Sequence, residues 1–244
     1  MTDTKRAMIG LDDIFGDLFG LNIKGMRSIV DVWIKPATYA KAARDEGWEG
    51  RYTPSIRLWL SMMAVGSFLQ FLWISDDAPI TKVFAEGFRD AGLSAPEGIT
   101  LTELGQEAAV WTYGLMPVVQ LVFLMFLAVF WRLWGAPTTV GLRVRYLLGV
   151  MIPSGSLMLA ILPVLAVMPE AYMTAYGLLL AVLAALVDWQ TSARGFITAK
   201  ARGGKLLRAL ALAVMIFVVN VGVSIIVQVA GVIIVANKYG LSPA

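Results

Sequence analysis

Five long apolar runs constrain this chain more than any other feature of its sequence. They cover residues 56–74, 108–131, 146–168, 171–187 and 210–236. A helix needs about 20 apolar residues to cross the hydrocarbon of a bilayer, and in lipid each backbone polar group must find its partner within the protein. Only 15% of the residues are charged, against roughly 25% in soluble domains. The sequence therefore predicts an all-α polytopic membrane protein whose membrane domain, residues 56–237, is a five-helix bundle.

Lysines and arginines fall almost entirely on one side of the predicted spans. Of the 20 in the chain, only Lys82, Arg89 and Lys238 lie on the other side, where the loop of residues 76–107 also carries seven acids. Loops rich in lysine and arginine stay in the cytoplasm, so we expect a cytoplasmic N-terminus and an extracytoplasmic C-terminus. Residues 1–20 contain four aspartates and no uninterrupted apolar core, so we expect no cleaved signal peptide.

Amphipathic helices are predicted in the cytoplasmic region of residues 1–55. The second covers about residues 26–46, is broken or started at Pro36, and is expected on the membrane surface, where its basic residues face anionic lipid. The first is acidic, so we expect it against the protein's own cytoplasmic face or a partner. Its apolar side recurs at helical spacing and comprises Leu11, Ile14, Phe15, Leu18 and Phe19.

The extracytoplasmic loop is predicted to contain a short helix. Pro79 suits its first turn, and Asp76 or Asp77 suits its cap. Its apolar face comprises Ile80, Val83, Phe84, Phe88 and Ala91. Residues 100–103, Thr-Leu-Thr-Glu, fit a capping box, so the helix of the second span is expected to begin near Leu101, outside the bilayer.

The fifth span carries a polar stripe. Four-residue spacing places its members on one helix face, and they are Asn220, Ser224, Gln228 and then Gly231. An amide without a partner costs several kcal/mol in hydrocarbon, so this face should point into protein. It either lines a path for a ligand or ion, or forms interhelical hydrogen bonds and close packing. Gln70 and Gln120, in the first two spans, are the candidate partners.

Asp188 follows directly on the fourth span, and ionisable residues in membrane segments are candidates for function. It either binds a ligand or handles a proton, or it is an interfacial residue paired with Arg194 or another loop cation. The third span contains Pro153-Ser154-Gly155-Ser156 and Pro163. We expect a kinked helix there, with freed carbonyls bonded by Ser154 or a neighbour; the alternative is a discontinuous helix lining a site.

Several kinds of chemistry are excluded or not indicated. The chain has neither cysteine nor histidine, which excludes thiolate and imidazole metal ligands and Ser–His or Cys–His catalysis. No phosphate-binding glycine loop or metal-spaced carboxylate cluster is visible. We therefore expect no catalytic, cofactor or metal site. Topology explains the basic loops, so nucleic acid is not indicated as a partner.

The segment before the first span contains the run Ile29 to Pro36, then Tyr39 to Ala43, and Trp48. This pattern resembles that of bacterial members of the Yip family, five-span membrane proteins of the Ypt/Rab-interacting type. The resemblance covers roughly residues 26–236, and the five-span layout with a cytoplasmic N-terminus is also the family's. It implies the fold and a membrane-organising role, with no catalytic residues to transfer, and is consistent with a bacterial inner membrane.

Three functions are open. The first is a non-enzymatic scaffold, assembly factor or accessory subunit of a membrane complex, with lipid and other membrane subunits or a second copy as partners. The second is a small-solute or lipid transporter that uses the fifth-span stripe and the kinked third span. The third is a lipid-modifying enzyme in which Asp188 and the arginines of the basic loops handle a phosphate head group.

Overall fold

The computed structural model describes residues 23–45, 47–130, 132–135, 137–166, 170–199 and 201–241. The first amphipathic helix expected from the sequence lies outside these residues. The described part is helical and contains no strand. Its helices are α2 (Ile23–Ile34), α3 (Pro36–Ala42), α4 (Trp48–Arg51), α5 (Ser55–Leu72), α6 (Pro79–Asp90), α7 (Leu101–Phe130), α8 (Val140–Ala166), α9 (Glu170–Thr191), the π-helix η1 (Ser192–Phe196) and α10 (Arg202–Tyr239).

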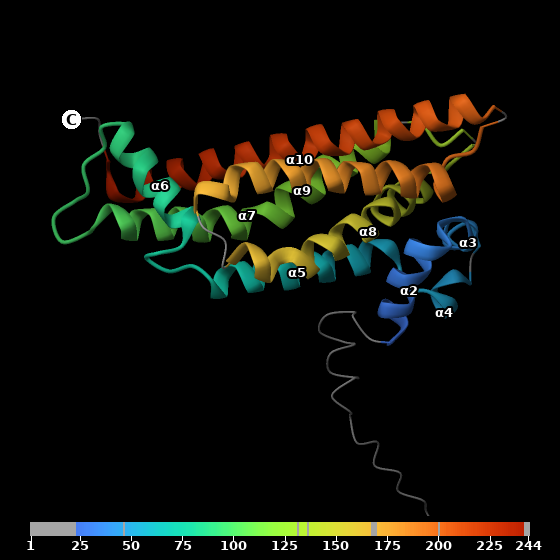
Figure 1. The fold of residues 1–244 in the computed structure, drawn as a ribbon, viewed down its shortest axis with the longest axis horizontal. Coiled ribbons are helices and arrows are strands. Elements are labelled where there is room, and N and C mark those ends of the chain that lie inside the picture. Colours follow the sequence, from blue (N-terminus) through green and yellow to red (C-terminus); the bar gives the residue numbers. More distant parts are fainter. Residues whose placement is uncertain are drawn as a thin grey trace, which may run out of the picture.

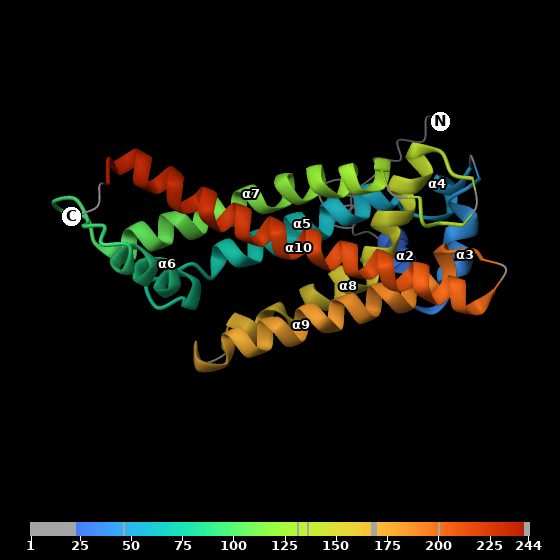
Figure 2. The ribbon, with the colours of Figure 1, turned by 90° about the horizontal axis from the view of Figure 1, so that it is seen from above.

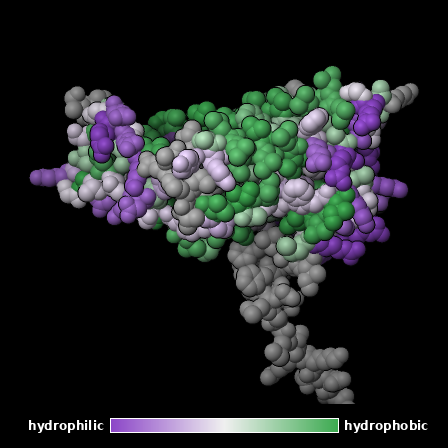
Figure 3. All heavy atoms as spheres, in the orientation of Figure 1, coloured by the Kyte–Doolittle hydropathy of each residue, from purple (hydrophilic) through white to green (hydrophobic). Residues whose placement is uncertain are grey.

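Five of these helices are long and apolar enough to cross a membrane, namely α5, α7, α8, α9 and α10. They lie along the length of the molecule, with α2, α3 and α4 at one end and α6 at the other (Figures 1 and 2). We call these ends the α3 end and the α6 end. An apolar band covers the middle of the molecule, and hydrophilic residues gather at both ends (Figure 3). The predicted all-α polytopic bundle is confirmed.

Local sequence signals explain where α7 begins. The backbone N–H of Thr100 donates to Glu103 Oε2 at 2.7 Å, and the backbone N–H of Glu103 donates to Thr100 Oγ1 at 3.2 Å. These reciprocal bonds are a capping box. They start α7 at Leu101, as predicted, so the last part of the predicted loop of residues 76–107 belongs to this helix.

The short helix α6 begins at Pro79, as predicted, but neither expected aspartate caps it. Asp76 instead accepts a hydrogen bond from Gln106 Nε2 at 2.7 Å, and Asp77 forms an ion pair with Lys82 at 3.6 Å. The face that α6 buries includes Phe84 and Phe88, as expected, whereas Val83, which was expected on the same face, is exposed. In place of a helix cap, Asp76 therefore bonds α7, and Asp77 pairs with a residue of α6.

The helix α10 spans both ends of the bundle. Its 38 residues extend over roughly 57 Å at 1.5 Å per residue, longer than the roughly 30 Å hydrocarbon core. At the α6 end, Lys238 Nζ lies 2.7 Å from Glu107 Oε1, and the Tyr239 hydroxyl donates to Glu107 Oε2 at 2.8 Å. These contacts fasten the end of α10 to α7.

An aromatic core fills the α3 end. The rings contact one another with centroids 5.1 to 6.4 Å apart and belong to Tyr39, Trp48, Tyr52, Trp134, Tyr146 and Phe196. The Tyr39 hydroxyl donates to the Thr53 carbonyl at 3.2 Å, and burial raises its pKa, so it remains a neutral donor. The predicted helix of residues 26–46 is two helices, α2 and α3, because Pro36 starts the second. The aromatic core joins α3 and α4 to α8 and η1.

The third span forms one continuous helix, α8, which includes both Pro153 and Pro163. The first part of α8 runs across the bundle, whereas the rest runs along it (Figures 1 and 2). The alternative of a discontinuous helix is therefore wrong. The Ser154 hydroxyl lies 3.1 Å from the Met151 carbonyl, and the Ser156 hydroxyl lies 2.8 Å from the Pro153 carbonyl. Neither is the carbonyl that Pro153 frees, which is that of Gly149, four residues earlier.

The helices α7 and α10 approach each other closely at Gly231. A Cβ atom on this glycine would lie 2.8 Å from both the Ala108 carbonyl oxygen and Thr112 Oγ1. Thr112 in turn lies 3.5 Å from the Val227 carbonyl of α10. Small residues that let helix backbones approach are typical of membrane helix interfaces. At Gly231, therefore, the predicted stripe serves close packing.

We predict that Gly231→Ala destabilises the bundle by about 1–3 kcal/mol, because the added methyl group overpacks the α7–α10 contact. Reversible unfolding in mixed detergent micelles measures this free energy. Gly222→Ala in the same helix is the control, since a Cβ there meets nothing within 4 Å. Equal stabilities of the two variants would contradict the assigned contact.

Candidate functional site

Two polar features that are separate in the sequence line the same cavity between α9 and α10. The cavity has a volume of about 220 Å³, and its polar lining consists of Asp188 from α9 and Asn220 and Ser224 from α10. The remaining lining residues are Ala181, Ala184, Ala185, Phe217 and Val221. We call this cavity the α9–α10 groove. It joins the acid and the stripe that the sequence analysis singled out.

The groove opens on the outside of the bundle. Val221 is 40% exposed, whereas Asp188 is only 2% exposed. The three alanines, Asn220 and Ser224 are partly buried. Neighbouring side chains on both helices are exposed and apolar, among them Val182, Leu186, Val218 and Ile225. Asp188 therefore lies at the floor of a groove in the apolar surface that faces lipid.

Asp188 is held from a third helix. The Ser154 hydroxyl of α8 donates to Asp188 Oδ1 at 2.6 Å, so α8, α9 and α10 all contribute to the site. From the sequence, Ser154 was expected only to bond a carbonyl at the kink, and its hydrogen bond to Asp188 was not predicted. The sequence contains a pattern that indicates one wall of the groove. Ala181, Ala184 and Asp188 recur at helical spacing and therefore lie on one face of α9.

The expected pairing of Asp188 with Arg194 is wrong. The helical chain continues beyond α9 through η1, so Asp188 lies inside the helical segment and not at its end. Arg194 donates instead to the carbonyls of Trp33 at 3.4 Å and Ile34 at 3.0 Å. These are the last carbonyls of α2, which have no partner within their own helix. The ion pairs formed among the described residues, Lys82–Asp77 and Lys238–Glu107, do not include Asp188.

The stripe on α10 divides between packing and the groove. Gln120 Nε2 of α7 donates to Asn220 Oδ1 at 2.8 Å, and Gln228 Nε2 donates to Ser224 Oγ at 2.9 Å. Gln120 is therefore a partner of the stripe, as predicted. Gln70 lines a different cavity. The packing interpretation holds for Asn220, which makes an interhelical bond. Asn220 also lines the groove, and the interpretation of the stripe as a path for a ligand or ion stays a prediction.

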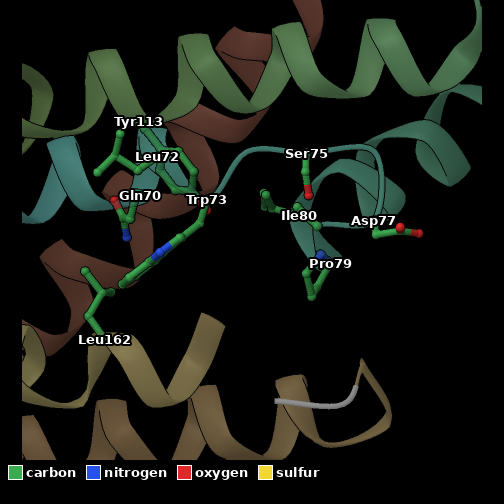
Figure 4. Close-up of a pocket in the computed structure, with 10 residues that line it drawn as sticks. Gln70, Leu72, Trp73, Ser75, Asp77, Pro79, Ile80, Tyr113 and Leu162 are labelled. Atoms are coloured by element: carbon green, nitrogen blue, oxygen red, sulfur yellow. The ribbon is translucent and has the colours of Figure 1, made fainter. Parts of the chain in front are cut away.

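A larger cavity, of about 470 Å³, lies toward the α6 end. Gln70, Trp73, Tyr113 and Leu162 line one side of it, and the start of α6 lines the other (Figure 4). Asp77 points away from Gln70 and Trp73 (Figure 4) and is almost fully exposed. The polar groups that line this larger cavity therefore do not converge on one point. The α9–α10 groove is the better candidate site.

The chemistry that the groove offers follows from its free groups. An ionised carboxylate accepts about four hydrogen bonds, and Asp188 receives one from Ser154. Across the described residues, no three acids are grouped to hold a metal ion. The groove therefore presents one buried carboxyl group beside an amide and a hydroxyl group, in an apolar setting.

A double-mutant cycle tests the α7–α10 bond. We expect Gln120→Leu and Asn220→Leu to be coupled by about 0.6 to 1.7 kcal/mol, the range found for hydrogen bonds between membrane helices. Unfolding in mixed micelles measures the coupling. Gln120→Leu combined with Gln228→Leu is the control and should be additive within about 0.5 kcal/mol. Coupling of the control pair alone would contradict the assigned bond.

Comparison with known proteins gives no relative from which to assign this site. No family model, no curated protein and no solved structure matches the chain. The resemblance to the Yip family therefore stays a prediction. The function of the groove follows from its own residues.

Proposed function

We propose that this protein is a non-enzymatic accessory or assembly subunit of a membrane complex, and that another chain packs a transmembrane helix into the α9–α10 groove. The observation that supports this proposal is the presence of Asp188, Asn220 and Ser224 in a groove on an otherwise apolar surface. Lipid tails offer no hydrogen bonds to such groups, and intramembrane ionisable residues typically face protein or water. A helix in the groove supplies that cover.

The position of α9 favours such a partner. It packs mainly against α8, α10 and η1, and it lies at the edge of the bundle (Figure 2). Leu178, Leu179 and Val182 are 62%, 58% and 51% exposed. A helix that enters the groove would bury these side chains as well, which adds packing contacts to the polar ones.

The proposal includes an orientation. Of the lysines and arginines in the described residues, Lys82, Arg89 and Lys238 are on α6 and at the last turn of α10, and the others lie toward the α3 end. Positive residues are retained on the cytoplasmic side. We place the α3 end in the cytoplasm, the C-terminus outside, and the protein in a bacterial inner membrane.

Transport of a small solute is the second candidate function. It is favoured by one observation, the meeting of Ser154, Asp188 and the α10 stripe at one cavity, because transporters bind substrates between helices near the membrane midplane. Its weakness is the opening toward lipid, where a polar solute finds no water. The enzyme hypothesis needed an arginine beside Asp188, and Arg194 lies instead at the end of α2.

Site-specific cross-linking in the native membrane tests the proposed function. Because the chain has no cysteine, Ala184→Cys introduces a single thiol in the groove, to which a photoactivatable label is attached. We expect one cross-linked protein of defined mass from this position. Val122→Cys is the control, since Val122 is 62% exposed on a different helix, α7, and it should give only lipid adducts.

Native mass spectrometry completes this test. A complex heavier than the 26.5 kDa chain, matching the cross-linked mass, is expected, and a mass of twice the chain would identify a second copy. Recovery of a monomer alone, with identical lipid adducts from both cysteine positions, would overturn the proposal. A monomer carrying a bound small solute would support transport instead.

A further inference from the structure

We infer that the helix occupying the α9–α10 groove carries a lysine or arginine at the level of Asp188. This inference rests on the proposed function and names the chemistry of the partner. Three observations support it. Asp188 lies on the groove floor, it has no basic partner among the described residues, and the groove is small.

The carboxyl group of Asp188 has no basic partner in the described chain. The carboxylate is 2% exposed and receives one hydrogen bond, from Ser154. Both ion pairs of the described residues lie at the α6 end. Burial without an opposite charge disfavours the ionised form of a carboxyl group. A lysine or arginine supplied from outside the chain would favour that form and would donate hydrogen bonds to the oxygen lone pairs that Ser154 leaves free.

The groove suits a side chain better than a free ligand. Its volume of about 220 Å³ is below the roughly 300–1,000 Å³ typical of small-molecule sites. Ala181, Ala184 and Ser224 are small, so the backbone of another helix can approach closely and direct a long side chain to the floor. Phe217 also lines the groove, and aromatic rings attract lysine and arginine cations.

A second copy of this chain does not supply the cation. The described parts of α7 and α9 contain no lysine or arginine. The lysines and arginines of α5, α8 and α10 lie in the first two turns or the last turn of each helix. Among them, Arg208 lies furthest inside α10. Asp188 lies instead opposite Phe217 and Asn220, farther along α10. The partner is therefore a different chain.

Synthetic transmembrane peptides test this inference. Each is a helix of alanine and leucine with one cysteine, and carries lysine, leucine or glutamate at one apolar position one turn from the cysteine. The lysine is placed at three depths in separate peptides. Each peptide is reconstituted with the Ala184→Cys protein in phosphatidylcholine vesicles, and the yield of the disulfide cross-link is measured.

We expect the lysine peptide with the best depth to cross-link about tenfold more than the leucine peptide, and the glutamate peptide to cross-link least. Asp188→Asn in the same protein should abolish the preference for lysine. This variant retains an oxygen that accepts the Ser154 bond, and circular dichroism checks that its helix content is unchanged. A preference for lysine that persists in Asp188→Asn would overturn the inference.

The peptide experiment distinguishes a failure of this inference from a failure of the proposed function. If lysine and leucine peptides cross-link equally at Ala184→Cys but weakly at the Val122→Cys control, then the groove binds helices without charge pairing, and only the inference fails. If no peptide distinguishes Ala184→Cys from Val122→Cys, then helix docking in the groove is contradicted, and the proposed function fails with it.

Discussion

The whole structure depends on the cost of exposing polar groups to hydrocarbon. Long apolar runs leave water for lipid, and once there each backbone N–H and C=O must be bonded within the protein, so the runs become helices. The same cost acts on side chains. Gln120 bonds Asn220, Gln228 bonds Ser224, and Ser154 bonds Asp188. Asp188 receives one hydrogen bond and belongs to neither ion pair of the described residues, so its ionised form would need a partner from outside the chain.

The bundle is held at its two ends by different means. At the α6 end, Lys238 and Tyr239 bind Glu107 of α7. At the α3 end, Tyr39, Tyr146 and Phe196 form the centre of a buried aromatic core that joins α3 to α8 and η1. Between these ends α9 has few protein neighbours on its outer side, and this asymmetry leaves the α9–α10 groove open to lipid.

Features set by neighbouring residues could be predicted from the sequence. The five spans follow from length and polarity, and the start of α7 follows from Thr100 and Glu103, which are one turn apart. The meeting of Asp188 with Ser154 and Asn220 could not be predicted, because the sequence does not contain the distances between helices. The predicted pairing of Asp188 with Arg194 is wrong for a related reason. The unbonded carbonyls of α2 lie next to Arg194 only in the folded chain, and they compete for its donors.

The central claim, that α10 crosses the membrane with its groove-lining middle in hydrocarbon, is tested most directly by thiol accessibility. Single cysteines at Gly203, Val221 and Asn237 sample the two ends and the middle of this helix. In sealed vesicles, a membrane-impermeant maleimide should label the cysteines at 203 and 237 from opposite sides, and the cysteine at 221 from neither. Labelling of both ends from the same side, or of all three positions from one side, would contradict the account.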